Sequence, residues 1–365
     1  GLFCRFLKLN ILNLSSDQIT LRQPDDWHVH LRDGETLGSI VKHTSRVFRR
    51  AVVMPNLDPP ITSIELAKNY RERILKTVPA DIAFTPLMTA YLTDNLPIDV
   101  LVDGFREGVF IGAKLYPVNA TTNSSYGVSD IHAIDVLLEA MERIDMPLLI
   151  HGEVTDLDVD IFDREAVFIE QKLEPMLRRF PKIRVVLEHI TTLQAVQFVE
   201  TSGFRLAATI TPHHLHINRN AMFAGGLRSD FYCLPVVKRE IHRLALRKAA
   251  TSGKSCFFLG TDSAPHLRAY KETACACAGI FNAPYAIESY AEIFEEENAL
   301  DRLEAFASEY GPAFYGLGLN KSSITLERKK HIVPKMLELG TSGNLKESVV
   351  PFHAGETLSW RILKN

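Results

Sequence analysis

The sequence predicts an α/β fold, a (β/α)8 TIM-type barrel with a small β-ribbon beside it. Eight short runs of strand-forming residues alternate with segments of helical period, and the runs are almost continuously apolar, as in a parallel sheet covered on both faces. The count of eight favours a closed barrel over an open doubly wound sheet. No Gly-x-Gly-x-x-Gly pattern follows any run, which weakens the dinucleotide-binding alternative.

The predicted elements follow one another in barrel order. The strands are "DWHVHL" (26–31), 51–56, 82–89, 112–117, 147–153, 184–191, 205–212 and 256–263. Helical periodicity separates them at 64–77, 98–107, 130–144, 161–179, 192–202 and 237–252, and continues at 284–297 after the last strand. Only the first connection, 35–49, is weakly patterned.

The two ends of the chain supply the predicted ribbon. Its strands are "QITLRQ" (18–23), "SSITLE" (322–327) and "TLSWRILK" (357–364). We expect residues 19–365 to form one metal-dependent barrel domain, and residues 1–18 to be an N-terminal extension that is processed or vector-derived. The apolar start is interrupted by charged and amide residues and lacks a small-residue cleavage site, so it does not match a signal peptide.

Charge and cysteine content narrow the class of partner. The 41 basic and 44 acidic residues are mixed along the chain and give a net charge of -3, which lacks the basic footprint of a nucleic-acid binder. No run reaches the length of a membrane span. Five scattered cysteines indicate a reducing, cytoplasmic compartment. Cys275 and Cys277 lack a second pair at metal-ligand spacing and are expected to be packed or free thiols.

Polar side chains end several predicted strands, where the chemistry of such barrels lies. In an extended first strand, His28, His30 and Arg32 share one face, while Trp27, Val29 and Leu31 face the other way. Further residues of this kind are Asn56, Lys114, His151, His189, Asp262 and, just beyond, His266. Each alone has an ordinary explanation, such as a solvated edge histidine, a lysine reaching solvent or a turn cap. Together, at one end of a barrel, they predict a metal site.

The donor set suits a pair of zinc-like ions. Four histidines and one aspartate are too many ligands for one tetrahedral ion that keeps a water and too few for two. Lys114 lies in the apolar strand "GAKLYP", where burial lowers its pKa and frees a neutral amine. That amine can add carbon dioxide, and the resulting carbamate could bridge two ions. The following "TPHHLHIN" holds His213, His214 and His216, which we do not expect to be ligands because adjacent histidines cannot all face inward.

The motifs resemble those of the dihydroorotases of compact bacterial type, in the amidohydrolase superfamily. The resemblance runs from about Ile19 to the C-terminus. It rests on "DDWHVHLRDG", "VVMPNLDPP", "GAKLYPVNATTNSSYG", "PLLIHGEVTD", "IFDREAVFIE", "LEHITT", "AATITPHHL", "YCLPVVKR", "LGTDSAPH" and "FNAPYA". It implies reversible interconversion of N-carbamoyl-L-aspartate and L-dihydroorotate, a step of pyrimidine synthesis, by a cytoplasmic homodimer.

The resemblance also assigns roles to individual residues. One zinc would be held by His28, His30, carbamylated Lys114 and Asp262, and the other by Lys114, His151 and His189. Asp262 would also be the general acid and base. The substrate carboxylate would meet Arg32, Asn56 and His266, the ring amide would meet backbone groups of Leu234 and Ala278, and a mobile loop would close over the substrate through Thr121 and Thr122.

Three rival functions remain to be weighed. Hydantoinases and dihydropyrimidinases use the same metals, but their substrates lack the ring carboxylate that Arg32, Asn56 and His266 would bind. An inactive scaffold barrel predicts gaps in the ligand set, and all six ligand positions are filled. Nucleotide-binding regulation would need a phosphate loop, and the sequence shows none.

Overall fold

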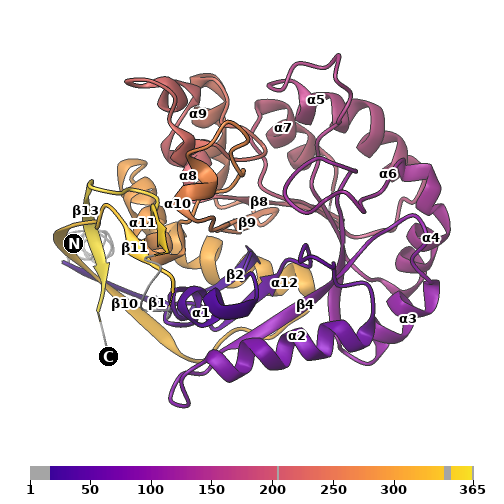
Figure 1. Ribbon diagram of the computed structural model, residues 1–365, viewed down its shortest axis with the longest axis horizontal. Coiled ribbons are helices and arrows are strands. Elements are labelled where there is room, and N and C mark those ends of the chain that lie inside the picture. The colour runs from indigo at the N-terminus through magenta and orange to yellow at the C-terminus, as the bar shows by residue number, and fades with distance from the viewer. Residues whose placement is uncertain (1–16, 204, 341–346, 364–365) are drawn as a thin grey trace, which may run out of the picture.

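A parallel barrel of eight strands forms the centre of the computed structural model, which describes residues 17–203, 205–340 and 347–363 (Figure 1). Neighbouring strands pair in chain order. The strands are β2 (Asp25–Val29), β3 (Arg50–Val53), β4 (Thr85–Tyr91), β5 (Phe110–Leu115), β6 (Leu148–Ile150), β7 (Val185–Leu187), β8 (Leu206–Ile210) and β9 (Phe257–Leu259). Each overlaps one of the eight predicted runs, so the predicted fold class is confirmed.

The barrel closes just beyond the end of β9. The Asp262 N–H donates to the His28 carbonyl oxygen at 2.8 Å, and the His30 N–H donates to the Ser263 carbonyl oxygen at 3.0 Å. Val29 and Ser263 form a parallel bridge at the same place. The seam between the first and last barrel strands therefore lies among predicted site residues.

Helices surround the barrel and bury their apolar stripes against it (Figure 1). In α2, for example, Ala67, Tyr70 and Ile74 are buried at helical spacing, and the Ser63 hydroxyl caps the first turn by accepting from the Leu66 N–H. The longer helices are α1 (Leu37–Ser45), α2 (Ile64–Thr77), α3 (Ile98–Arg106), α4 (Asp135–Ile144), α7 (Leu193–Thr201), α9 (Glu240–Ala250) and α11 (Ala286–Glu296). The shorter ones are α5 (Arg164–Phe168), α6 (Glu174–Arg179), α8 (Pro212–His216), α10 (Arg268–Lys271) and α12 (Tyr310–Tyr315).

The short helices α8, α10 and α12 were not predicted, and two further helical regions differ from the prediction for a physical reason. The weakly patterned connection 35–49 contains α1, whose buried positions include Leu37, Ile40, Val41 and Thr44; the polar threonine obscures a regular helical stripe. The single predicted helix 161–179 is divided into α5 and α6 by a π-helical turn. Pro175 enters at the first turn of α6, where its missing N–H is tolerated.

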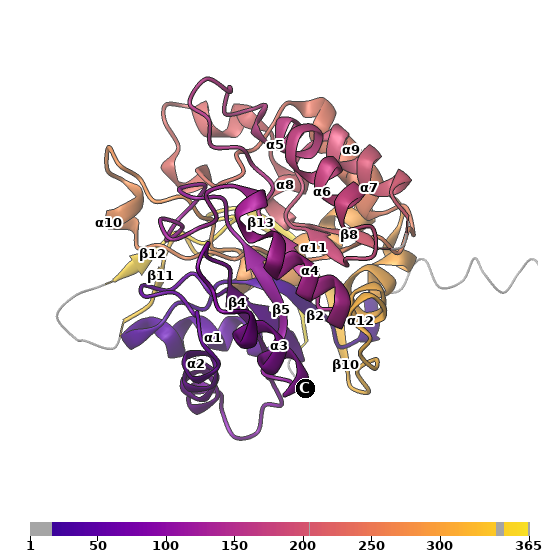
Figure 2. The ribbon, with the colours of Figure 1, turned by 90° about the vertical axis from the view of Figure 1, so that its right-hand side faces the viewer.

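The terminal ribbon is present as an antiparallel sheet in the order β1-β10-β13 (Figure 1). Its strands are β1 (Gln18–Arg22), β10 (Ser323–Ile332) and β13 (Thr357–Ile362). A two-residue pair, β11 (Leu337–Glu338) with β12 (Ser348–Val349), was not predicted (Figure 2). Residues 1–16 of the expected extension lie outside the described residues, and Gln18 already belongs to β1.

One side-chain direction on the first strand was predicted wrongly. Val29 and Leu31 join the layer between sheet and helices, but Trp27 belongs to the inner cluster of the barrel. Its ring stacks on Tyr315 of α12 with centroids 4.5 Å apart and meets the edge of Phe258. The register of β2 against β3 shifts between Asp26 and Val29, and this irregularity breaks the alternation of two.

Within the described part of the chain, no helix has the length and apolar character needed to cross a bilayer. The described cysteines Cys233, Cys256, Cys275 and Cys277 form no disulfide with one another.

Candidate active site and metal centre

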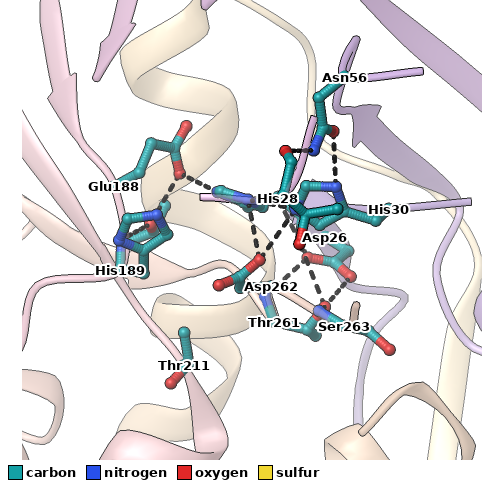
Figure 3. A network of polar contacts seen from close by, with 12 residues as sticks. Asp26, His28, His30, Asn56, Glu188, His189, Thr211, Thr261, Asp262 and Ser263 are labelled. Atoms are coloured by element: carbon teal, nitrogen blue, oxygen red, sulfur yellow. Dashed lines mark hydrogen bonds and ion pairs between the residues drawn. The ribbon is translucent and has the colours of Figure 1, made fainter. Parts of the chain in front are cut away.

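The six predicted metal ligands lie together at the carboxyl ends of the barrel strands. His28 and His30 come from the end of β2, Lys114 from β5, His151 and His189 from directly after β6 and β7, and Asp262 from after β9. All six are buried, with between 0% and 8% of their surface exposed. Figure 3 shows His28, His30, His189 and Asp262 converging on one space.

Three of these side chains form a tight triangle. His28 Nε2 lies 3.1 Å and His30 Nε2 lies 3.0 Å from the same Asp262 oxygen, Oδ1, and the two nitrogens are 3.3 Å apart. On the far side of each ring, His28 Nδ1 meets Glu188 at 2.7 Å and His30 Nδ1 meets the Asn56 oxygen at 2.9 Å. Burial alone would lower the pKa of His28, but Glu188 and Asp262 outweigh it and raise that pKa, so a protonated His28 ring can donate to both carboxylates. A metal ion held by His28, His30 and Asp262 would take the place of that proton: Glu188 and Asn56 would keep each ring's proton on Nδ1 and leave Nε2 to bind the ion.

The other predicted ligands leave polar atoms without partners. Lys114 Nζ and His189 Nδ1 are buried and have no hydrogen-bond partner among the described residues. His151 donates Nε2–H to Glu153 at 2.7 Å, which leaves its Nδ1 lone pair free. The rings of His151 and His189 have centroids 4.7 Å apart. A buried unpaired amine and imidazole nitrogen fit a site that metal ions complete.

Burial sets the protonation states that such a site requires. It lowers the pKa of the Lys114 amine, and it holds the pKa of His189 well below its usual range. Burial would raise the pKa of Asp262, but His28 and His30 outweigh it, so the pKa of this carboxyl lies well below its ordinary value. Burial therefore favours the neutral forms of the Lys114 amine and the His189 imidazole, while the neighbouring histidines keep the Asp262 carboxylate ionised.

Three buried acidic residues beside the proposed metal ligands were not predicted from the sequence. Glu188 accepts from both His28 and the Thr209 hydroxyl, and Glu153 accepts from His151. Asp26 accepts from the Thr261 N–H and hydroxyl, and burial raises its pKa to about 7. The signal was available in "LEHITT" and "HGE", where an acid stands next to, or two residues after, a strand-end histidine.

Backbone strain is concentrated at the same place. Arg32, His189 and Asp262 have φ values of 59°, 39° and 48°, in the left-handed region that non-glycine residues rarely adopt. Because Arg32 is not in an extended conformation, the alternation of side chains predicted for the first strand does not continue to this residue. Such conformations cost of order 1–3 kcal/mol each and are typically retained at functional sites.

The residues expected to bind the substrate carboxylate lie beside the triangle. Arg32 is partly buried, and its Nε donates to the Pro265 carbonyl oxygen at 3.0 Å. His266 Nε2 lies 3.0 Å from both an Arg32 amino group and the Ala278 carbonyl oxygen. Burial, together with Arg32, lowers the pKa of His266 to about 2, so the ring is neutral. One nitrogen either accepts from Arg32 or donates to Ala278, and only one contact can be satisfied at a time.

The predicted threonine loop follows β5 and lies against both sides of the site. Thr122 donates through its hydroxyl to the Ala278 carbonyl oxygen at 3.3 Å, and its own carbonyl accepts from the Asn56 amide at 3.0 Å. Asn123 donates back to the Asn56 carbonyl oxygen at 3.0 Å, and the Thr121 N–H is held by Ser124. The loop therefore spans from Asn56 to Ala278. Leu234, the other predicted backbone contact, is partly buried and follows Tyr232 by two residues.

A second cluster of metal-ligand residue types is formed by His213, His214 and Cys233. Contrary to the expectation that adjacent histidines diverge, His213 and His214 are both buried. His214 is already satisfied by the Thr211 hydroxyl and the Pro235 carbonyl, and burial lowers its pKa to about 4. Burial raises the pKa of Cys233 to about 12, so this thiol stays protonated. His213 Nε2, by contrast, is buried without a hydrogen-bond partner among the described residues, and the absence of metal from this cluster stays a prediction.

Comparison with known proteins gives consistent matches over most of the chain. The pattern of the amidohydrolase family matches residues 26–333. A dihydroorotase of Synechococcus sp. (strain CC9605) is 64% identical over 347 residues, which cover 95% of this chain and 97% of that protein. The crystal structure of a Campylobacter jejuni dihydroorotase has a TM-score of 0.86 at 36% identity, covering 97% of this chain and 99% of that one. An L-hydantoinase of Arthrobacter aurescens (TM-score 0.78, 13% identity, 94% of this chain and 83% of that one) shares the fold alone.

Proposed function

The chain belongs to the amidohydrolase family, and from that premise we propose that it is a dihydroorotase. It interconverts N-carbamoyl-L-aspartate and L-dihydroorotate plus water, a step of pyrimidine synthesis. The observation that carries the assignment is the position of Arg32, two residues after the ligand His30 and held by Pro265 and His266. A guanidinium there suits a ring carboxylate, which hydantoin and dihydrouracil lack.

Two zinc ions would complete the site. His28, His30 and Asp262 would hold one ion, His151 and His189 the other, and Lys114 as its carbamate would bridge them. The close approach of His28 Nε2, His30 Nε2 and the Asp262 oxygen, together with the unpaired Lys114 amine, supports this assignment. When bound, the ions lower the pKa of water and polarise a carbonyl group.

Asp262 is the proton carrier in this proposal. Its carboxylate is ionised, so in the hydrolytic direction it can take the proton that water loses on adding to the ring amide carbonyl. The same oxygen then returns the proton to the ring nitrogen as the carbon–nitrogen bond breaks. In the synthetic direction the two transfers run in reverse.

The remaining predicted residues bind and enclose the substrate. Arg32 and His266 would grip the carboxylate, while the backbone at Leu234 and Ala278 would recognise the ring amide. Asn56 can join them through the second N–H of Nδ2, because the first donates to the Thr122 carbonyl oxygen, and one amide would then contact both the carboxylate and the loop. Closure of Thr121 and Thr122 over the ring would exclude water and orient the substrate.

The wider cellular context is also part of the proposal. We place the enzyme in the cytoplasm as a homodimer, with the barrel and its ribbon, from Gln18 onward, as one catalytic domain. The substrates are small molecules, and nucleic acid and membranes have no part in the reaction.

The test is hydrolysis of L-dihydroorotate, followed by loss of ring absorbance, with the protein as prepared, after chelation and after zinc is restored. Dihydrouracil and hydantoin are assayed beside it. We expect turnover of dihydroorotate alone, lost on chelation and recovered with zinc. Turnover of the carboxylate-free rings would move the assignment to the hydantoinases, and no turnover with metal bound would indicate an inactive barrel.

A further inference from the structure

Lys271, at the end of α10, ties together two segments beside the proposed substrate site. Its side chain is buried, and its Nζ donates to three carbonyl oxygens, those of Tyr232 (2.7 Å), Cys277 (2.9 Å) and Gly279 (2.7 Å). An ammonium group has three donors, so all of them are used. Burial lowers the pKa of Lys271 to about 8, which keeps the group charged at neutral pH.

The three acceptors surround the positions expected to recognise the ring amide. Cys277 and Gly279 stand on either side of Ala278, and Tyr232 precedes Leu234 by two residues. Because the carbonyls of Cys277 and Gly279 point to Lys271, the Ala278 carbonyl between them faces elsewhere. It meets His266 at 3.0 Å and Thr122 at 3.3 Å, on the side of the site.

The segment around Ala278 is confined from its other side as well. Gly279 has φ +153°, and a Cβ there would lie only 2.5 Å from the Ala264 carbonyl oxygen. The Ala264 N–H donates to the Ile280 carbonyl oxygen at 2.9 Å, and the Gly279 N–H donates to the Tyr232 carbonyl oxygen at 3.0 Å. The segment around Ala278 therefore packs closely against Ala264, two residues before His266. Lys271 holds the carbonyl groups of Cys277 and Gly279 in the same segment.

We propose that Lys271 is a positioning residue for ring recognition, which fixes the peptide groups at Ala278 and Leu234 and thereby sets the KM for the cyclic substrate. The inference rests on the proposed function, because it takes these two backbone positions to face the ring amide. Lys271 itself makes no contact with the six proposed metal ligands in any of its hydrogen bonds. Its loss should therefore weaken substrate binding and leave the metals and the proton carrier in place.

The first variant is Lys271→Met, which keeps the aliphatic stem and removes all three donors. In the zinc-loaded full chain we expect the KM for L-dihydroorotate to rise roughly tenfold or more, with kcat within about threefold of the wild type. Zinc content, measured by mass spectrometry, should be unchanged. Lys248→Met, at an exposed position on α9, is the matched control and should leave both constants at their wild-type values.

Lys271→Arg is the second variant, and it keeps the charge. The donors of a guanidinium lie on a flat fork and cannot converge on three oxygens that surround one nitrogen, so an intermediate KM is expected. A wild-type KM in folded Lys271→Met, or a loss of zinc together with activity, would overturn the proposal. If Lys271→Met does not fold, the KM of Lys271→Arg decides in the same way. Failure of the proposed function is distinguishable, since the wild-type protein would then not turn over dihydroorotate.

Discussion

Replacing Lys114 by methionine should stabilise the metal-free protein, although Lys114 is the proposed bridge between two ions. Its side chain is fully buried, at 0% exposure, and Nζ has no hydrogen-bond partner among the described residues. A buried polar group left unpaired costs about 1–3 kcal/mol. Methionine has a similar length, brings no donor and removes this cost, so Lys114→Met should gain about that amount.

The assay is urea unfolding of both proteins in excess chelator. With a slope of about 3 kcal/mol per M, the expected gain moves the midpoint upward by roughly 0.3–1 M. With zinc restored the order should reverse, because only the wild type gains the full free energy of binding two ions. The variant should also be inactive under both conditions.

Lys114→Ala separates the two effects of the substitution. It removes the same amine but leaves a cavity, so it should be less stable than Lys114→Met by about 2–5 kcal/mol. A metal-free Lys114→Met protein that is less stable than the wild type would refute the reasoning about the unpaired amine. A variant that still binds two zinc ions per chain would refute the bridge.

Four further results are expected. The stability advantage of metal-free Lys114→Met should shrink as pH rises toward 10.5, the ordinary pKa of lysine. Burial lowers the pKa of Lys114 in the folded protein, so the unfolded chain binds more protons and the wild type becomes more stable as pH rises. Urea midpoints measured at several pH values will test this. Arg32→Met should raise the KM for dihydroorotate roughly 10–100-fold through loss of a charged contact, and an unchanged KM would remove Arg32 from the carboxylate site. Glu153→Ala, which frees the His151 ring, should weaken zinc binding roughly 10–100-fold in competition with a chromophoric chelator. Gly311→Ala should lower the free energy of unfolding, measured by thermal denaturation, by more than about 1–3 kcal/mol, because its Cβ would lie 1.8 Å from Trp27 Nε1. A smaller loss would show that the packing around Trp27 can adjust to the added methyl group.

The barrel and the proposed ligands could be predicted because both depend on patterns that are local in sequence. Apolar runs recur eight times, and ligand-type residues such as His151 and His189 stand directly after them. Element boundaries shifted by a few residues, as in β4, predicted at 82–89 and observed at Thr85–Tyr91. Strand pairs as short as β11 and β12 carry no periodicity at all.

What could not be predicted depends on contacts between distant segments. The inward turn of Trp27 follows from a register shift between β2 and β3, which the alternation rule cannot anticipate. The motif "LEHITT" could have marked Glu188 as an acid beside a strand-end histidine, but it does not reveal that its oxygen lies 2.7 Å from His28, 160 residues away in the chain. Lys271 has no motif of its own, and its three carbonyl partners belong to loops.

The seam of the barrel has a consequence for how this chain acquires function. The contacts that join β2 to the segment after β9 involve His28 and His30 on one side and Asp262, 232 residues after His30, on the other. No partly folded intermediate or shortened chain lacking the last strand can assemble the triangle. Because closing so long a loop is slow, zinc capture is expected to come at the end of folding. Newly synthesised chains would then become active only after the barrel has closed, because the ion is held by residues from both the first and the last barrel strands.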